Sequence, residues 1–171
     1  MTNAVPPKVQ TILITGATGA IGSALAITYA QAGIRLVLHG RRSETLASVA
    51  ERCRDRGALV DTSGVELTDD TALAEWLTQI SRQHLPDIAI LNAGQNAHPV
   101  GAGYLEPEDD MTSLVDINLR VPMAMAQQLV PGMRARGSGQ LVFISSLAGW
   151  HGLPGTPTYS ATKAGIKAYG E

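Results

Sequence analysis

Residues 9–22, VQTILITGATGAIG, join an apolar run to a glycine-rich turn. The run up to Ile14 is rich in β-branched residues and is closed by glycines, which predicts a buried strand. Residues 24–31, ALAITYAQ, predict a helix. Glycines let the backbone turn sharply and let an anion approach, and the N–H groups of a helix start face negative charge. The stretch therefore predicts a diphosphate-binding turn, with a plain strand-to-helix turn as the alternative.

Length and composition limit the class of protein. The chain has 171 residues, of which 44% are hydrophobic and 16% charged. These values predict a polar tail at 1–8 and a single globular domain at 9–171. A net charge of −2 gives no reason to expect a nucleic-acid partner, and no apolar run is long enough to span a membrane. A lone cysteine, Cys53, and no Cys/His cluster predict a cytoplasmic protein without a metal site.

Short apolar runs alternate with helical segments along the whole chain. Strands are expected at residues 9–14, 35–39, 58–63, 87–91 and 140–145. Helices are expected at 20–32, 43–56, from 68–70 onward, at 108–136 and from 158 onward, with Ser43 capping the second and Gly33 ending the first. This alternation predicts an α/β fold with a doubly wound parallel sheet. Ligands of such sheets bind at the carboxyl ends of the strands.

The end of the second strand is where the adenosine ribose of a dinucleotide meets such a sheet. An NAD site needs an acid there, whereas an arginine accommodates the 2′-phosphate of NADP. The chain has His39-Gly40-Arg41-Arg42, with no acid before Glu44. The planar fork of a guanidinium suits a phosphate, although solvated charges at a helix start are the alternative. We therefore expect NADP(H) as the preferred cofactor and NAD(H) as the second choice.

Tyr159 and Lys163 are four residues apart on the last expected helix and so share one face. An ammonium near a phenol favours the phenolate, which allows the phenol to exchange a proton near neutral pH. Small residues at 92–94 end the fourth strand, and Ser145 and Ser146 end the fifth. These side chains would all lie at the ligand-binding edge of the sheet.

In these features the chain resembles the short-chain dehydrogenases/reductases. The matching residues follow one another in the family's order over nearly the whole chain, and they are Thr15-Gly16 to Gly22, Asn92-Ala93-Gly94, Asn118, Ile144-Ser145-Ser146 and residues 159–165, YSATKAG. The resemblance implies a Rossmann-type fold with strand order 3-2-1-4-5. It also implies NAD(P)-dependent interconversion of a carbonyl and a secondary alcohol.

The resemblance also implies a role for each matching residue. Tyr159 would be the general acid/base, and Lys163 would hold the ribose and favour the phenolate. Ser146 would bind the substrate oxygen, and Asn118 would help to hold a proton-relay water. The expected cofactor-binding residues are Gly16, Thr18, Gly19, Ala20, Ile21, Gly22, Arg41, Arg42, Glu66, Leu67, Asn92, Ala93, Gly94, Tyr159 and Lys163.

Two features depart from the short branch of the family. The Gly16-Gly19-Gly22 spacing is similar to the extended branch, and Glu66 stands where the family usually has Asp. A nucleotide-sugar epimerase or dehydratase is therefore one alternative, and a non-catalytic dinucleotide-sensing or scaffold protein is another. Residues 92–94 and the intact Tyr159–Lys163 pair favour an NADP(H)-dependent oxidoreductase of the short branch, acting on a small-molecule carbonyl or alcohol.

The expected helix at 108–136 carries two further predictions. Pro122 has no N–H to offer the Asn118 carbonyl, which predicts a kink there. The freed carbonyl would be a place for an ordered water, and a bend that only wraps the helix round the core is the alternative. The helix also has more apolar residues than one sheet-facing stripe needs, namely Met111, Leu114, Val115, Val121, Met125, Leu129 and Met133. Together with the resemblance, this surplus predicts a homodimer or homotetramer through helices 108–136 and 158–171.

The chain stops at Glu171, where members of the family continue with further strands and a substrate lid. We therefore expect residues 1–171 to be truncated after the helix that carries Tyr159 and Lys163 and to lack the family's last strands. A longer chain of which this is one part is the favoured explanation, and a natural truncation is the alternative. The fifth strand would then be an apolar edge of the sheet.

Overall fold

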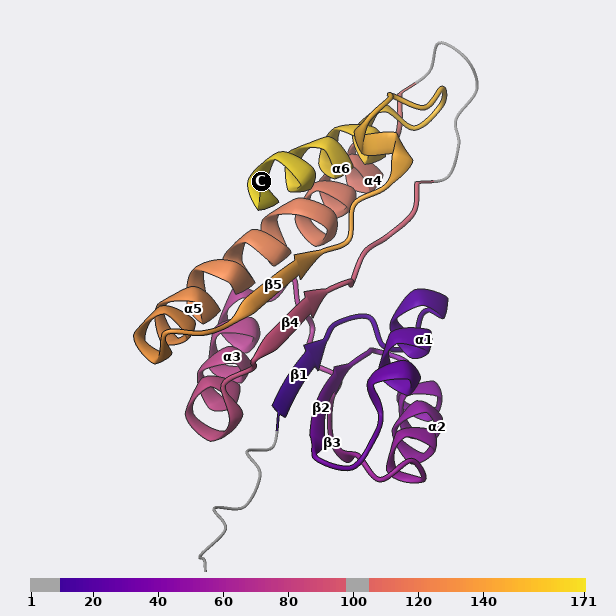
Figure 1. Ribbon diagram of the computed structural model, residues 1–171. Coiled ribbons are helices and arrows are strands. Elements are labelled where there is room, and N and C mark those ends of the chain that lie inside the picture. Colours follow the sequence, from indigo (N-terminus) through magenta and orange to yellow (C-terminus); the bar gives the residue numbers. More distant parts are fainter. Residues whose placement is uncertain (1–9, 98–104) are drawn as a thin grey trace, which may run out of the picture.

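The computed structural model describes residues 10–97 and 105–171, so the expected tail at 1–8 and the centre of the loop at 95–107 lie outside it. Within these residues, parallel strands form one sheet in the order β3-β2-β1-β4-β5 (Figure 1). The strands are β1 (Gln10–Ile14), β2 (Ile34–His39), β3 (Leu59–Ser63), β4 (Ile88–Leu91) and β5 (Gln140–Phe143). The predicted fold class and strand order 3-2-1-4-5 are confirmed.

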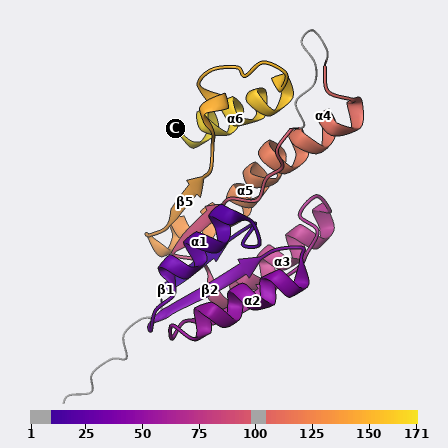
Figure 2. The ribbon, with the colours of Figure 1, turned by 90° about the vertical axis from the view of Figure 1, so that its right-hand side faces the viewer.

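Helices connect the strands and cover both faces of the sheet. They are α1 (Ala20–Tyr29), α2 (Ser43–Arg54), α3 (Asp70–His84), α4 (Glu108–Val115), α5 (Val121–Arg136) and α6 (Pro157–Gly170). The first two lie on one face, and α3 and α5 lie on the other (Figure 1). α6 packs against α4 at the end of the molecule beyond β5, and the second view shows the same grouping (Figure 2).

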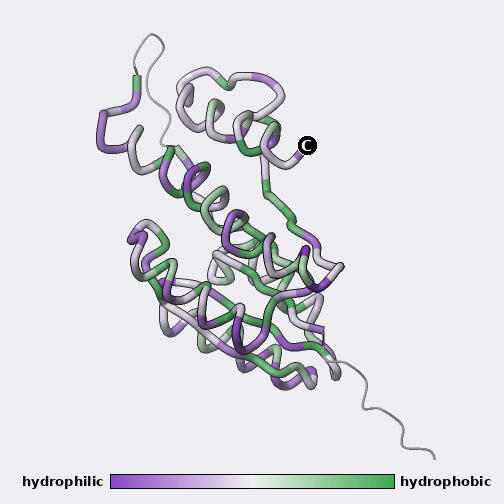
Figure 3. Tube along the Cα trace, turned by 90° about the vertical axis from the view of Figure 1, so that its left-hand side faces the viewer, coloured by the Kyte–Doolittle hydropathy of each residue, from purple (hydrophilic) through white to green (hydrophobic). Residues whose placement is uncertain are grey.

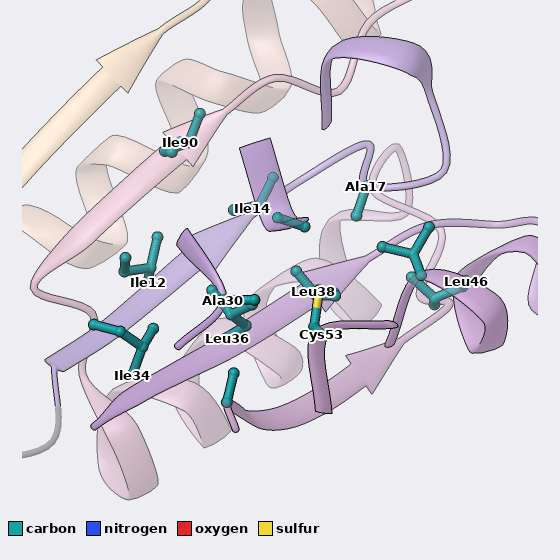
Figure 4. Close-up of a cluster of buried hydrophobic side chains, with 13 residues drawn as sticks. Ile12, Ile14, Ala17, Ala30, Ile34, Leu36, Leu38, Leu46, Cys53 and Ile90 are labelled. Carbon is teal, nitrogen blue, oxygen red and sulfur yellow. The ribbon is translucent and has the colours of Figure 1, made fainter. Parts of the chain in front are cut away.

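Each face of the sheet has its own apolar core because strand side chains alternate between the faces. Ile12, Leu36 and Leu38 pack under α1 and α2 in the first core (Figure 4). Leu13 and Val37 point to the other face and pack against α3 and α5. β1 is therefore buried on both sides, and each of its fully buried side chains contributes about 1.5–3 kcal/mol. The hydropathy colouring of the Cα trace shows hydrophobic segments through the middle of the molecule and recurring hydrophilic residues along the coils around it (Figure 3).

Several helix ends differ from the sequence-based expectation. α1 ends at Tyr29, and Gly33, with φ +85°, instead forms the turn into β2. Ser43 is the first residue of α2 and not its cap, because the N-cap position belongs to Arg42. The acidic start of α3 was predicted correctly, since the Asp69 side chain accepts two backbone N–H bonds of the first turn.

A wide helical turn at Asn118 interrupts the helix expected at 108–136. A π-helical segment, Asp116–Arg120, separates α4 from α5 and contains Asn118. The Val121 N–H donates to the Asp116 carbonyl, five residues back. Pro122 follows at once and has no N–H to continue the normal α-helical ladder. Segments of this kind occur frequently at functional sites.

The apolar surplus expected on helix 108–136 is mostly absent. Five of its seven apolar residues are buried, four of them in the core beneath α5, namely Leu114, Val121, Met125, Leu129 and Met133. Met111 and Val115 remain 41% and 39% exposed. The prediction that these apolar residues are surplus to the sheet was therefore wrong for most of this helix, because they are buried within the protein's own fold.

Candidate active site

A pocket of about 510 Å³ opens at the carboxyl ends of the strands, where the sequence predicts a ligand. Its wall combines the glycine turn after β1, the segments that follow β2, β3 and β4, the end of β5 and one face of α6. All the residues expected to bind the cofactor line this pocket, with the exception of Gly22. The topology thus brings together residues that lie up to about 150 positions apart in the sequence.

The glycine turn has the shape of an anion cradle. Gly16 adopts φ +69°, a left-handed conformation that favours glycine. Gly22 packs against this turn, because a Cβ there would lie 2.2 Å from the Gly16 carbonyl oxygen. Gly19, the N-cap of α1, is open by contrast, since its nearest protein neighbour would be 3.4 Å from an added Cβ. As a glycine, Gly19 has no side chain to cap the helix start, so the N–H groups there can serve a phosphate.

The arginines after β2 lie on the pocket wall with Glu66. One guanidinium nitrogen of Arg41 is 3.5 Å from Glu66 Oε2, and the Arg41 side chain is 72% exposed. Arg42 donates to the carbonyl of Thr18 in the glycine turn. Burial acts to raise the pKa of Glu66, but hydrogen bonds from Thr68 and the charge of Arg41 outweigh it and hold the pKa below its usual value. Two cations thus flank the expected ribose position.

His39 lies on the same wall, and sequence reasoning did not assign it a role. Its Nε2 is 2.8 Å from the carbonyl oxygen of Val65, so Nε2 carries the hydrogen and donates. Its Nδ1 is buried and has no hydrogen-bond partner among the residues described. The ring packs against Trp76 with centroids 5.4 Å apart. Burial lowers the pKa of His39, which favours a neutral ring.

Tyr159 and Lys163 lie together where the pocket meets α6. The Lys163 Nζ is 5.8 Å from the centroid of the Tyr159 ring. It donates to the carbonyl of Ile144, at the end of β5, over 2.9 Å. Lys163 is only 7% exposed, and within residues 10–97 and 105–171 it forms no ion pair with a carboxylate. Burial therefore lowers the pKa of this ammonium.

Asn118 is buried behind the pocket wall and not on it. Its Oδ1 accepts the Gln95 N–H over 2.8 Å, and its Nδ2 donates to the Gln95 carbonyl over 2.9 Å. Both ends of the side-chain amide thus hold the backbone that follows β4. Gly94 fits closely here, since an added Cβ would lie 2.8 Å from Asn118 Oδ1.

The two serines after β5 have different environments. Ser146 is the N-cap of a short 3₁₀ turn, Leu147–Gly149, and its Oγ accepts the Ala148 N–H over 3.2 Å. Ser145 lines the pocket, and its Oγ donates to the Lys163 carbonyl over 2.8 Å. Ser145 thus ties the end of β5 to α6, while Ser146 lies off the pocket wall.

The pocket wall also includes residues to which the sequence assigned no catalytic or cofactor-binding role, which are His39, Gly40, Gln95, Asn96, Ile117, Ile144 and Ser145. Six of these seven lie at or shortly after the end of a strand, and Ile117 lies in the π-helical segment. A position at the end of an expected strand could have identified these six from the sequence, because the carboxyl ends of parallel strands meet at one edge of the sheet.

Other kinds of site are not found in the part of the chain that the structure describes. It contains no group of three or more His, Cys, Asp or Glu side chains arranged to hold a metal ion. Its helices are too short or too polar to cross a membrane.

The fold is a Rossmann-type α/β fold with its pocket at the carboxyl ends of the strands, and comparison with known proteins gives its family. Residues 10–171 match the family described as short chain dehydrogenase. The chain therefore belongs to the short-chain dehydrogenase family of oxidoreductases.

Individual relatives support this assignment. The chain is 34% identical over 158 residues to gluconate 5-dehydrogenase of Gluconobacter oxydans, covering 91% of this chain and 60% of the relative. A bulky-bulky ketone specific alcohol dehydrogenase from Comamonas testosteroni superposes with a TM-score of 0.86 at 29% identity, over 95% of this chain and 64% of that one. A short-chain dehydrogenase from Sphingobium yanoikuyae, solved with NADPH, gives 0.84 at 30% identity, over 94% and 63%. The chain thus spans 60–64% of the length of these proteins.

Proposed function

We propose that this protein is an NADP(H)-preferring oxidoreductase that interconverts a carbonyl and a secondary alcohol. The observation that carries the proposal is the presence of Tyr159, Lys163, the glycine turn and Arg41 on the wall of one pocket. NADP(H) would supply or accept the hydride when bound. The relatives named as a ketone-specific alcohol dehydrogenase and as a gluconate dehydrogenase agree with this class of reaction.

The residues that would hold the cofactor follow from the pocket. The uncapped start of α1 and the open side of Gly19 suit a diphosphate. Arg41 and Arg42 would bind the 2′-phosphate of NADP(H). The Sphingobium relative, which was solved in complex with NADPH, supports this choice of cofactor. NAD(H) is the second choice, because exposed arginines do not exclude an unphosphorylated ribose.

Tyr159 would carry the proton. In carbonyl reduction its hydroxyl would donate to the substrate oxygen, and in alcohol oxidation the phenolate would remove the hydroxyl proton. The Lys163 ammonium lies 5.8 Å from the centroid of the Tyr159 ring and would hold the ribose. Its present acceptor, the Ile144 carbonyl, keeps the ammonium at this depth. Ser146 would bind the substrate oxygen, and Asn118 would hold a water of the proton relay.

The substrate experiment separates three functions. The purified protein is mixed with NADPH or NADH and a panel of small and medium ketones, aldehydes and secondary alcohols, and absorbance of the reduced cofactor is followed. We expect turnover with NADPH and at least one carbonyl. Nucleotide sugars form a separate arm, because their turnover would favour the epimerase or dehydratase alternative. NADPH binding without turnover in any arm would favour a sensor or scaffold and contradict the proposal.

A further inference from the structure

The first turn of α6, which contains Tyr159, is held by hydrogen bonds to a residue from a distant part of the chain. The N-cap residue of this helix, Thr156, makes no side-chain cap bond, because its hydroxyl is directed to the Leu153 carbonyl. The first helical residue, Pro157, has no N–H. The first backbone donor of the helix is therefore the N–H of Thr158, which needs an acceptor from elsewhere in the protein.

Glu106 supplies that acceptor from a position 52 residues away in the sequence. Its Oε1 accepts the Thr158 N–H over 3.0 Å, and its Oε2 accepts the Thr158 hydroxyl over 3.1 Å. The residue is only 8% exposed. Both carboxyl oxygens of Glu106 thus accept hydrogen bonds from Thr158, the residue immediately before Tyr159.

Within residues 10–97 and 105–171, the carboxyl group of Glu106 has no cationic partner, since no Lys, Arg or His there forms an ion pair with it. A buried carboxylate is costly unless hydrogen bonds and local dipoles compensate it. Here the compensation comes from the two Thr158 bonds and from the positive end of α6. The stability of this arrangement therefore depends on the exact placement of the helix start.

The same residue lies at the entrance to α4. Pro107, the next residue, is the N-cap of α4, and α4 leads directly into the π-helical segment that holds Asn118. α4 and α6 pack against each other, as Figure 1 shows. Glu106 therefore links the segment that carries Asn118 to the helix that carries Tyr159 and Lys163.

We infer that Glu106 is a positioning residue for Tyr159, which it holds in place through the Thr158 backbone and hydroxyl. This inference rests on the proposed function for its kinetic part only, since the support of the helix start is independent of activity. A displacement of a reacting group by about 1 Å can lower a rate by about 10²-fold. Loss of Glu106 should consequently lower kcat far more than it weakens cofactor binding.

The test compares Glu106→Leu with Glu106→Gln, and Glu108→Leu is the matched control because Glu108 is exposed and two residues away. We expect Glu106→Leu to lower kcat at least tenfold while the NADPH dissociation constant changes less than twofold. Gln keeps an oxygen for the Thr158 N–H, so Glu106→Gln should keep kcat within threefold of wild type. The control should leave both constants unchanged.

Amide hydrogen exchange, measured by NMR, provides a readout that needs no turnover. The Thr158 amide should exchange at least tenfold faster in Glu106→Leu, and at the wild-type rate in Glu106→Gln and Glu108→Leu. If Glu106→Leu does not fold, Thr158→Val gives the answer, since it removes only the hydroxyl bond and should lower kcat two- to fivefold.

Two results would overturn the inference. One is a folded Glu106→Leu protein with kcat within twofold of wild type, and the other is unchanged exchange at Thr158. A wild-type protein that reduces no carbonyl would instead refute the proposed function, and the exchange rates would then decide the role of Glu106 by themselves.

Discussion

Arg41→Ala should weaken NADPH binding about tenfold and leave NADH binding unchanged. Hydrogen bonds to charged groups are worth about 1.5–3 kcal/mol. The low end applies here, because the Arg41 side chain is 72% exposed and its guanidinium already lies 3.5 Å from Glu66. A tenfold change corresponds to about 1.4 kcal/mol. Glu66→Gln should have the opposite effect, because it removes a negative charge that competes with the 2′-phosphate for Arg41.

Isothermal titration with NADPH and NADH measures both dissociation constants for each variant. Arg52→Ala serves as the control, since Arg52 is an exposed arginine in the last turn of α2 and does not line the pocket. The wild-type protein should bind NADPH at least tenfold more tightly than NADH. Equal constants for the two cofactors, or a parallel loss of both in Arg41→Ala, would refute the assignment of Arg41 to the phosphate.

Three further predictions follow from the structure. Lys163→Met should abolish turnover and raise Tm. Tm should rise because burial lowers the pKa of Lys163, so the folded protein stabilises the ammonium less than water does. A lower Tm would contradict this reasoning. The pKa of His39 lies below 6.5 when folded, so the free energy of unfolding should fall as pH drops below about 6.5, where only the unfolded chain takes up the proton. Chemical denaturation between pH 5 and pH 8 measures this dependence. The free energy of unfolding should change less steeply with pH in His39→Gln than in the wild-type protein. Light scattering at micromolar concentration should show a homodimer or homotetramer, as the family resemblance implies, and a monomer would exclude it.

Much of the fold could be predicted because local patterns determine it. The apolar runs of β1 and β2 and the intervening glycine turn follow from hydrophobicity and backbone freedom. Helix ends were less predictable, since Gly33 is equally suited to a helix cap and to the turn into β2 that it actually forms. The π-helical segment was expected only as a kink, because Pro122 shows where the α-helical ladder must break but not how the chain closes it.

The site was predictable where residues follow strand ends and unpredictable where contacts join distant segments. Tyr159 and Lys163 share a helix face, so their spacing places them together. The hydrogen bonds that Thr158 donates to Glu106 join a threonine and an acid in separate segments, and no local pattern indicates them. The amide of Asn118 likewise holds the Gln95 backbone, a contact that requires the folded sheet.

The most direct test of the central claim is the turnover of Tyr159→Phe, measured with NADPH and a carbonyl that the wild-type protein reduces. This change removes the hydroxyl and keeps the ring. General acid catalysis contributes about 10²–10⁴-fold, so kcat should fall at least a hundredfold while the NADPH dissociation constant stays within twofold of wild type. A variant that kept more than about a tenth of wild-type kcat would show that Tyr159 is not the proton donor.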